Sequence, residues 1–226
     1  MVCNDKYTAI IGDIVDSRKI RNRNEVQRKF KSVLDEINTK YAEDIASKFT
    51  ITLGDEFQGL LKSKKNILKI LWDIEMAMSP YEMRFGIGIG EINTDIDLDR
   101  SPTIDGPAYY RARKMVTELD NLKSQYAGRH SNMMICSDDN YTESDELINS
   151  VFSLCTALKS KWTQRQKEII YAYFSNEENQ YKAARALGIG QSSVSKALNH
   201  ARFYTYKSAI DTVSLVLSGE RGSADD

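Results

Sequence analysis

The sequence predicts a mixed α+β domain followed by a smaller all-α domain. Short apolar strands alternate with segments of helical period as far as about residue 158, whereas residues beyond 161 show helical patterns only. With 226 residues, 41% of them hydrophobic, the chain can form one large domain or two small ones. We predict a first domain over residues 1–158, a helix-turn-helix domain over 159–218 and a disordered tail over 219–226.

The composition excludes several classes of protein. The net charge is −1, and the three cysteines (Cys3, Cys136 and Cys155) lack the spacing of a metal knuckle. Two histidines, His130 and His200, are too few for a zinc site. No apolar run approaches the roughly 20 residues that span a membrane, and a strand pattern begins almost at the N-terminus, which leaves no signal peptide. These features predict a cytoplasmic protein without a membrane partner.

Two acidic side chains stand where predicted strands end. The apolar run Tyr7–Ile14 turns polar at Asp13, and the alternating run Phe49–Leu53 ends at a Gly-Asp turn containing Asp55, before Phe57–Leu61 resumes. Carboxylates at a rigid turn suit Mg²⁺, provided that a second carboxylate lies nearby. The alternative is that Gly-Asp is only a turn sequence, which its backbone preferences also explain.

Helices are predicted on either side of this hairpin. Apolar positions recur at helical spacing over residues 25–41 and again over residues 65–78, where Pro80 ends the pattern. The link Arg18–Asn24 is rich in arginine and lysine. We interpret this link as a solvated loop, with phosphate contact as the alternative.

The next predicted strand, Met83–Ile92, has glycine at every second position from Gly86 to Gly90. One face of the strand therefore lacks side chains. Such a face is costly unless a packed helix or a ligand base must approach the backbone closely. The acidic loop over residues 93–103 lacks the glycine and the terminal glutamate of an EF-hand, so we interpret it as solvated.

A predicted helix over residues 108–122 begins with a dense group of aromatic and cationic side chains. A cationic helix start can grip a phosphate, because amide and arginine donors both favour anions. The alternative is a charged, solvent-facing helix. The group consists of Tyr109, Tyr110, Arg111, Arg113 and Lys114.

The remaining predicted elements are a strand over residues 132–136 and helices over 144–158, 164–173 and 202–217. Between the last two, residues 179–201 follow a helix-turn-helix pattern, with Gly188 at the turn and Ile189, Val194 and Leu198 between the helices. From Lys161 to Ile210, eight basic residues face three acidic ones, a net charge of +5. The pattern favours contact with double-stranded DNA, and the alternative is a helical hairpin for protein contact.

The outward face of the second helix carries short polar and basic side chains that can reach base edges and phosphates. We expect the helix over 202–217 to support a homodimer. The predicted DNA-contacting residues are Gln191, Ser192, Ser193, Ser195, Lys196, Asn199 and Arg202.

Three short motifs carry a family resemblance. Residues 12–18 (Gly-Asp-Ile-Val-Asp-Ser-Arg), 54–59 (Gly-Asp-Glu-Phe-Gln-Gly) and 105–108 (Asp-Gly-Pro-Ala), followed by the helix-turn-helix pattern, resemble the SatD family over nearly the whole chain. The first two thirds also resemble class III nucleotide cyclases and the related GGDEF palm domains. That resemblance implies a ferredoxin-like βαββαβ palm.

The cyclase resemblance also implies site residues. Asp13, Asp55 and the main-chain carbonyl of Ile14 would hold Mg²⁺ or Mn²⁺ on a nucleoside triphosphate. Cyclases place an asparagine and an arginine four residues apart on the following helix, where this chain has Tyr110 and Lys114. The candidate catalytic residues are Lys114, Arg111 and Arg113. The candidate nucleotide-binding residues are Gly54, Glu56, Gly88, Tyr110 and Arg111.

Three functions are consistent with these patterns. The first is a bacterial DNA-binding regulator whose palm-like domain binds a metal ion with a nucleoside triphosphate or a cyclic nucleotide. The second is an enzyme, a nucleotide cyclase or oligonucleotide synthase with an appended DNA-binding domain. The third is a degenerate palm that serves only as a dimerisation scaffold.

Overall fold

The structure, a computed structural model, describes residues 6–125 and 131–219. The chain divides into two compact units, the first formed by Met1–Ser153 with Ser214–Asp226 and the second by Leu154–Val213. The N-terminal residues and most of the tail predicted over 219–226 lie outside the described residues, as does His130. Every helix in the described ranges is too short or too polar to cross a membrane.

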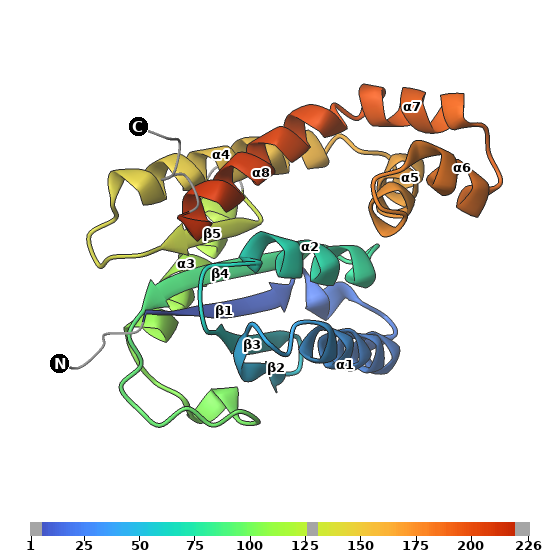
Figure 1. Cartoon of the computed structure of the whole chain (residues 1–226). Coiled ribbons are helices and arrows are strands. Elements are labelled where there is room, and N and C mark those ends of the chain that lie inside the picture. Colours follow the sequence, from blue (N-terminus) through green and yellow to red (C-terminus); the bar gives the residue numbers. More distant parts are fainter. Residues whose placement is uncertain (1–5, 126–130, 220–226) are drawn as a thin grey trace. The chain divides into compact units, whose positions relative to one another are not determined.

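A five-stranded sheet in the order β2-β3-β1-β4-β5 forms the centre of the first unit (Figure 1). β1 runs antiparallel to both β3 and β4, and β4 runs parallel to β5. Mixed α+β architecture is therefore confirmed. The strands are β1 (Tyr7–Ile14), β2 (Ile45–Leu53), β3 (Glu56–Leu61), β4 (Met83–Gly90) and β5 (Met133–Cys136). The helices between them are α1 (Arg23–Lys40), α2 (Ile67–Met78) and α3 (Pro107–Gln125).

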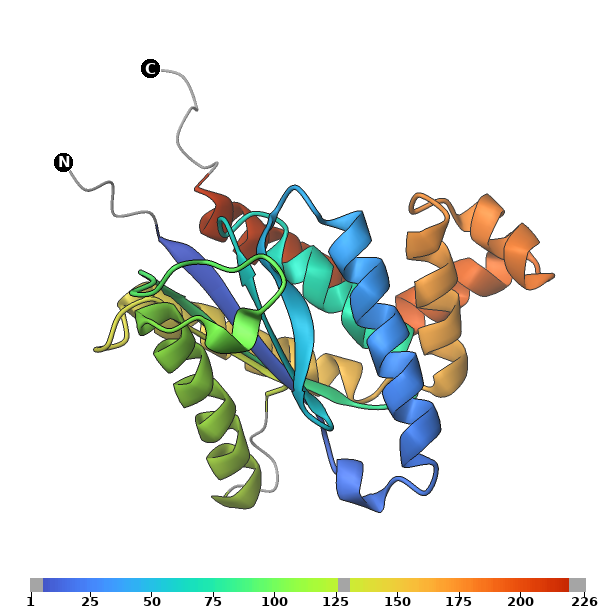
Figure 2. The same ribbon diagram turned by 90° about the horizontal axis from the view of Figure 1, so that it is seen from below.

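One face of the sheet holds an aromatic core beneath α1 and α2, and Figure 2 shows these two helices on the side of the sheet away from α3. Phe57 of β3 makes ring contacts with Phe30 of α1, at 5.6 Å between centroids, and with Phe85 of β4, at 6.3 Å. Gly12 of β1 leaves space for both rings, since a Cβ there would lie closer than 3.0 Å to each of them. Asp13, the next residue, therefore faces the other side of the sheet, because successive side chains of a strand alternate.

α3 packs directly on the glycine face of β4. A Cβ added at Gly88 would lie closer than 3.0 Å to main-chain atoms of Ala108 and Ala112, and one at Gly86 would lie 2.8 Å from a methyl group of Val116. The close approach that the glycines allow is thus that of a helix backbone. Around it lie the buried residues Ala9, Ile11, Leu60, Ile104, Ala108, Tyr109, Ala112 and Val116.

The second unit is helical throughout its described length. α5 (Gln164–Ser175) begins with a capping box at Thr163, and α6 (Gln180–Leu187) is followed by Gly188 at φ 64°, a left-handed conformation that favours glycine. α7 (Gln191–His200) buries Val194 and Leu198 completely. The chain enters this unit through α4 (Glu143–Lys159) and leaves it through α8 (Phe203–Ser218).

The structure shows which apolar residues of a predicted helix are buried, and it corrects one sequence-based interpretation. Leu147 and Leu154 follow a helical apolar pattern, yet each is 68% exposed, because α4 buries the adjacent stripe of Ile148, Phe152 and Cys155. The acidic loop over residues 93–103 is anchored rather than simply solvated. Within it, the short helix η2 (Ser101–Thr103) is docked on the sheet by buried polar contacts, such as the 2.7 Å hydrogen bond from the Gln58 amide to the Ser101 carbonyl.

Candidate metal and nucleotide site

The sheet register assembles a row of charged side chains on the face covered by α3. Asp13 of β1 is paired with Glu56 of β3 on one side and with Arg84 of β4 on the other. Directly paired residues of neighbouring strands project to the same face. The three side chains therefore lie next to one another at the end of the sheet where β1 ends.

Asp13 and Arg84 form a two-pronged ion pair. The Nε of Arg84 donates to Oδ1 of Asp13 at 3.0 Å, and its Nη2 donates to Oδ2 at 2.6 Å. The third guanidinium nitrogen, Nη1, donates to Asp120 of α3. The Asp13 and Arg84 side chains are only 14% and 13% exposed. Both oxygens of the first predicted metal ligand are thus occupied by one guanidinium.

Asp55, at the β2–β3 turn, lies against the end of β1. Its main-chain carbonyl accepts a hydrogen bond from the Ile14 amide at 3.1 Å, and its carboxylate accepts one from the Ser17 hydroxyl. Gly54 adopts φ 41° in this turn, and its carbonyl accepts a hydrogen bond from Gln27 of α1 at 3.0 Å. The hairpin therefore carries Asp55 to the side of Asp13, as the metal-site hypothesis requires.

Electrostatics at Asp13 reflect this crowding. Burial raises the pKa of the Asp13 carboxyl, Arg84 opposes that rise, and the nearby negative charges of Asp120 and Asp55 add to it. The balance leaves the pKa above its ordinary value. An acid in this state gains from any further positive charge placed beside it.

Glu56 completes the row with a second arginine. Burial of Glu56 acts to raise the pKa of its carboxyl, but hydrogen bonds from Arg113 of α3 and from Thr52 outweigh it, so the pKa lies below its usual range. Nη2 of Arg113 donates to Oε1 of Glu56 at 2.8 Å. The Arg113 side chain is 47% exposed, whereas that of Glu56 is 13% exposed. Arg113 thus belongs to the same charged row.

The other predicted nucleotide-binding and catalytic residues do not join this row. The Arg111 guanidinium donates to the carbonyls of Ile89 and Ser137, at 2.6 and 3.1 Å, and to Asp139 at 3.0 Å. Lys114 lies over the Tyr141 ring, 4.6 Å from its centroid. Arg111 therefore braces β4 against the segment after β5.

Two further predicted residues have local partners. Tyr110 is 56% exposed, and its hydroxyl donates to Asp105. Gly88 is in contact with α3, which fills the space that a base would need. The cationic start of α3 thus contributes one side chain, Arg113, to the row beside Asp13.

Three members of the site are not among the residues predicted from the sequence: Arg84, Asp120 and Ser17. The sequence does indicate which face Arg84 lies on. Arg84, Gly86 and Gly88 are alternate residues of β4, so the Arg84 side chain projects to the face covered by α3. Asp120 lies seven residues after Arg113, two helical turns along the same face of α3. Arg84 is brought to Asp13 by the strand register, and Asp120 is brought to Arg84 by the packing of α3 on the sheet; the sequence alone supplies neither.

The donor set fits a metal held jointly with phosphate. Across the described residues, no group of three or more histidine, cysteine or acidic side chains is placed to hold a metal ion by itself. Mg²⁺ commonly takes one or two carboxylates and completes its shell with water and substrate phosphates. Asp13 and Asp55 match that pattern, with the Ile14 carbonyl as the predicted third oxygen.

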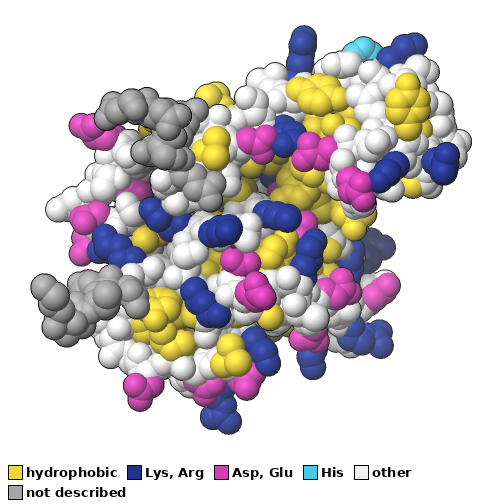
Figure 3. All heavy atoms as spheres, viewed as in Figure 1, with side chains coloured by type: hydrophobic (Ala, Val, Ile, Leu, Met, Phe, Trp, Pro, Cys, Tyr) yellow, Lys and Arg dark blue, Asp and Glu magenta, His cyan; other side chains and the backbone are white. Residues whose placement is uncertain are grey.

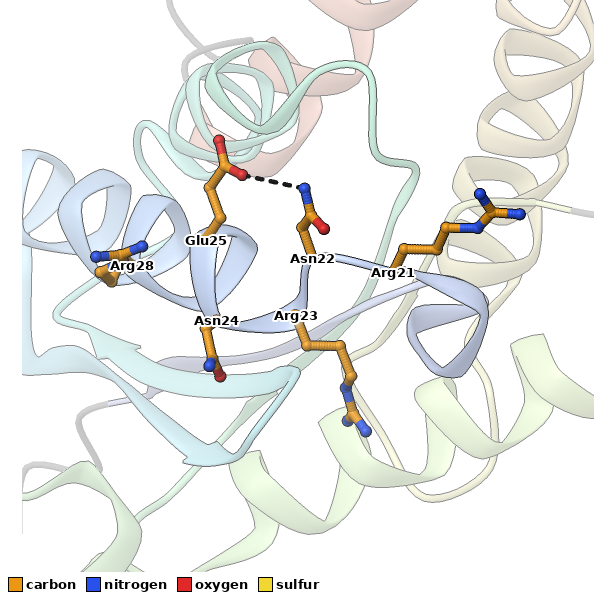
Figure 4. A pocket seen from close by; sticks show the side chains of 6 residues that line it. All are labelled: Arg21, Asn22, Arg23, Asn24, Glu25 and Arg28. Carbon is orange, nitrogen blue, oxygen red and sulfur yellow. Dashed lines mark hydrogen bonds between the residues drawn. The ribbon is translucent and has the colours of Figure 1, made fainter.

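A separate shallow pocket of about 440 Å³ lies at the start of α1. It is lined by Arg21, Asn22, Arg23, Asn24, Glu25 and Arg28. Figure 4 shows the Arg28 side chain pointing away from those of Arg21 and Arg23, so the guanidiniums do not converge on one point. Phosphate contact by this basic link stays a prediction.

In the second unit, α7 presents its polar face outward. Ser192, Ser193, Lys196 and Asn199 are exposed, while Gln191 and Ser195 are half-buried. Gln191 donates to Gln180 of α6 at 2.6 Å, and Asn199 donates to the Ser195 carbonyl at 2.9 Å. Arg202, after the helix, is also exposed. Lys and Arg side chains are visible on the surface of this unit in Figure 3.

The chain belongs to the SatD family, whose model matches residues 7–213. No curated protein matches it by sequence. Among solved structures, it is similar to a bacterial light-regulated adenylyl cyclase, with 15% identity, 58% of this chain and 75% of that chain covered, and a TM-score of 0.39.

Two further similar structures are cyclases. One is the guanylyl cyclase domain of a RhoGC fusion protein from the aquatic fungus Blastocladiella emersonii, with 14% identity, 50% and 75% coverage and a TM-score of 0.37. The other is the adenylyl cyclase CyaB from P. aeruginosa, with 16% identity, 48% and 70% coverage and a TM-score of 0.34.

Proposed function

We propose that the first unit binds a nucleoside triphosphate together with Mg²⁺ or Mn²⁺ and catalyses nucleotidyl transfer, as a cyclase or an oligonucleotide synthase. The observation that carries this proposal is the adjacency of Asp13 and Asp55: Asp13 lies on β1, and Asp55, at the β2–β3 turn, accepts a hydrogen bond from the amide of Ile14, the residue after Asp13. Two carboxylates with two arginines beside them suit a ligand that combines a divalent cation with a polyphosphate.

The residues of the row divide the work by their chemistry. Asp13 and Asp55 offer carboxylate oxygens to the cation, and Arg84 and Arg113 offer guanidinium donors to the phosphates. When bound, the metal would stabilise the attacking and leaving oxygens of an in-line displacement. Lys114 and Arg111 are bound elsewhere, so Arg113 is the strongest candidate among the predicted catalytic residues.

Incubation with the four ribonucleoside triphosphates and Mg²⁺ or Mn²⁺ tests this proposal, with products separated by liquid chromatography. We expect a cyclic or oligomeric product from the wild-type protein and none from Asp13→Ala or Asp55→Ala. Asp97→Ala, a change to another acidic residue of the first unit outside the row, is the control and should retain activity. Nucleotide binding without any product would indicate that the first unit senses nucleotide but does not convert it. The absence of nucleotide binding in calorimetry would indicate that this unit serves only as a dimerisation scaffold.

We further propose that α6 and α7 form a helix-turn-helix that binds double-stranded DNA, which would make the protein a DNA-binding regulator or target the enzyme to DNA. The left-handed Gly188 between the two helices and the buried Val194 and Leu198 support it. So do the exposed Lys196 and Arg202, neither of which has an ion-pair partner among the described residues. Binding to random-sequence duplex at low salt, measured by fluorescence anisotropy, should disappear when residues 159–218 are replaced by a neutral helical pair. Binding that survives this replacement would exclude the proposal.

We also propose that the protein forms a homodimer. The cytoplasmic homodimer should appear in sedimentation equilibrium as twice the chain mass of 25.7 kDa. α8 is the candidate contact, because Leu215 and Val216 on it are 40% and 44% exposed. A monomer at micromolar concentration would exclude a stable dimer.

A further inference from the structure

We infer that Arg84 makes the Asp13–Asp55 site selective for a metal–polyphosphate complex over the free metal ion. The inference rests on the proposed function and assigns Arg84 the part of a specificity-determining residue. Its ligand class is a divalent cation carried by a linear polyphosphate, such as the triphosphate of a nucleotide.

The Asp13 carboxylate already has a charged partner in the structure. Nε and Nη2 of Arg84 contact the two oxygens of Asp13 at 3.0 and 2.6 Å. The side chains of both residues are at least 86% buried, so solvent has little access to the pair. A cation that binds Asp13 directly therefore competes with the guanidinium for these two oxygens.

If a cation displaces the Arg84 guanidinium from Asp13, the guanidinium needs new hydrogen-bond acceptors. Nη1 of Arg84 also donates to Asp120, so α3 keeps the arginine close to the site after it leaves Asp13. A largely buried guanidinium that loses one or both Asp13 oxygens as acceptors carries a desolvation cost unless other acceptors replace them. A free metal ion supplies no acceptor and adds positive charge beside the arginine.

A polyphosphate can supply those acceptors. Phosphate oxygens match the planar fork of arginine and form charge-assisted, two-pronged hydrogen bonds with it. A metal-bound polyphosphate therefore gives Asp13 its cation and Arg84 its anion at the same time. The ion pair between Asp13 and Arg84 would be exchanged for two new ones without leaving an unpaired charge.

Arg113 offers an internal comparison. It pairs with Glu56 in a similar way, at 2.8 Å for Nη2, but its side chain is 47% exposed against 13% for Arg84. Water can solvate the Arg113 guanidinium when it separates from the Glu56 carboxylate. Replacing Arg113 should therefore change the affinity for free metal less than replacing Arg84 does. The selectivity is accordingly assigned to Arg84.

The test uses three probes on the full-length protein: MnCl₂ alone, the preformed Mn²⁺–tripolyphosphate complex, and tripolyphosphate with EDTA. Calorimetry measures all three, and the Mn²⁺ paramagnetic resonance signal counts bound metal. Wild-type protein should bind the complex at least about tenfold more tightly than Mn²⁺ alone. Arg84→Gln should bind free Mn²⁺ more tightly than wild type, and should bind the complex about tenfold less tightly.

Two more variants complete the design. Arg84→Lys keeps the positive charge but lacks the planar guanidinium with its paired N–H donors. Its affinity for free Mn²⁺ should lie between those of wild type and Arg84→Gln. Arg84→Lys also takes the place of Arg84→Gln if thermal melting shows that Arg84→Gln does not fold. Arg165→Gln removes the same charge from the second unit, where Arg165 is 54% exposed, and should match wild type.

The outcomes separate the inference from the proposed function. If wild type binds the complex but Arg84→Gln shows unchanged preference, Arg84 has no role in selectivity and only the inference fails. If Arg84→Gln and Arg84→Lys bind free Mn²⁺ no better than wild type, the inference fails in the same way. If wild type binds neither Mn²⁺ nor the complex, the proposed function fails and takes the inference with it.

Discussion

Gly88→Ala should destabilise the first unit by about 1–2 kcal/mol, and the reason lies in how α3 packs on β4. A Cβ at residue 88 would come closer than 3.0 Å to the carbonyl oxygen of Ala108 and the amide nitrogen of Ala112, whereas ordinary contacts begin near 3.4 Å. Both are main-chain atoms, so the helix itself must retreat. Overpacking of this kind costs about 1–3 kcal/mol, and alanine recovers only about 0.5–1 kcal/mol through its lower backbone entropy.

Urea unfolding followed by circular dichroism measures this loss. Gly86→Ala should behave in the same way, because a Cβ there would lie 2.8 Å from Val116 Cγ2 and 2.9 Å from the Val116 amide nitrogen. Gly190→Ala is the control: the nearest atom would be 3.6 Å away, so it should cost under about 1 kcal/mol as a weaker helix cap. A Gly88→Ala protein within about 0.5 kcal/mol of wild type would show that α3 does not pack against β4 as described.

Three further changes test other parts of the molecule. Because the folded-state pKa of Glu56 is depressed, its ionised form stabilises the protein above the unfolded pKa of about 4.5, and this contribution is lost as the pH falls through the folded pKa. The melting temperature of Glu56→Gln should therefore fall less on acidification than that of wild type. Parallel curves of melting temperature against pH for the two proteins would refute this prediction. Leu198→Ala, at a fully buried site, should cost about 2–4 kcal/mol in urea unfolding, while exposed Leu154→Ala should cost under about 0.5 kcal/mol; equal losses would contradict the packing of α7. Lys196→Ala should weaken binding to all duplex sequences alike and reduce the slope of log K against log salt by about one. Anisotropy titrations at several salt concentrations measure both effects. A loss of affinity that depends on the duplex sequence would show that Lys196 contacts bases instead of phosphates.

Most elements of the fold could be predicted from periodicity, and their ends could not. The strand predicted from Phe49 begins at Ile45, because Ile45 and Ser47 also pair with β3. Hydrogen bonding to a neighbouring strand determines where a strand begins and ends, and the alternation of apolar side chains does not determine it. The exposed leucines of α4 show the same limit. The sequence indicates that the helix has apolar residues on adjacent stripes, but it does not indicate which stripe is buried.

The site was predictable only in part, for a related reason. Asp13 and Asp55 could be identified because each ends a strand pattern, and strand ends and turns are recognisable locally. Arg84 had no such mark. It pairs with Asp13 because β1 and β4 align in one register, and a shift of one residue would have turned it to the other face.

The glycines of β4 connect the fold to the chemistry of the site. They let α3 approach the sheet closely, and α3 carries both Arg113 and Asp120. Through these two side chains the helix contacts Glu56 and Arg84, the neighbours of Asp13 on either side. A methyl group at Gly88 should therefore move the charged row as well as the core, because the same retreat of α3 would lengthen both contacts. Weakened Mn²⁺–tripolyphosphate binding by Gly88→Ala, with Gly190→Ala unchanged, would establish that close helix packing holds the charges in register, whereas full affinity at reduced stability would show that the row forms independently of it.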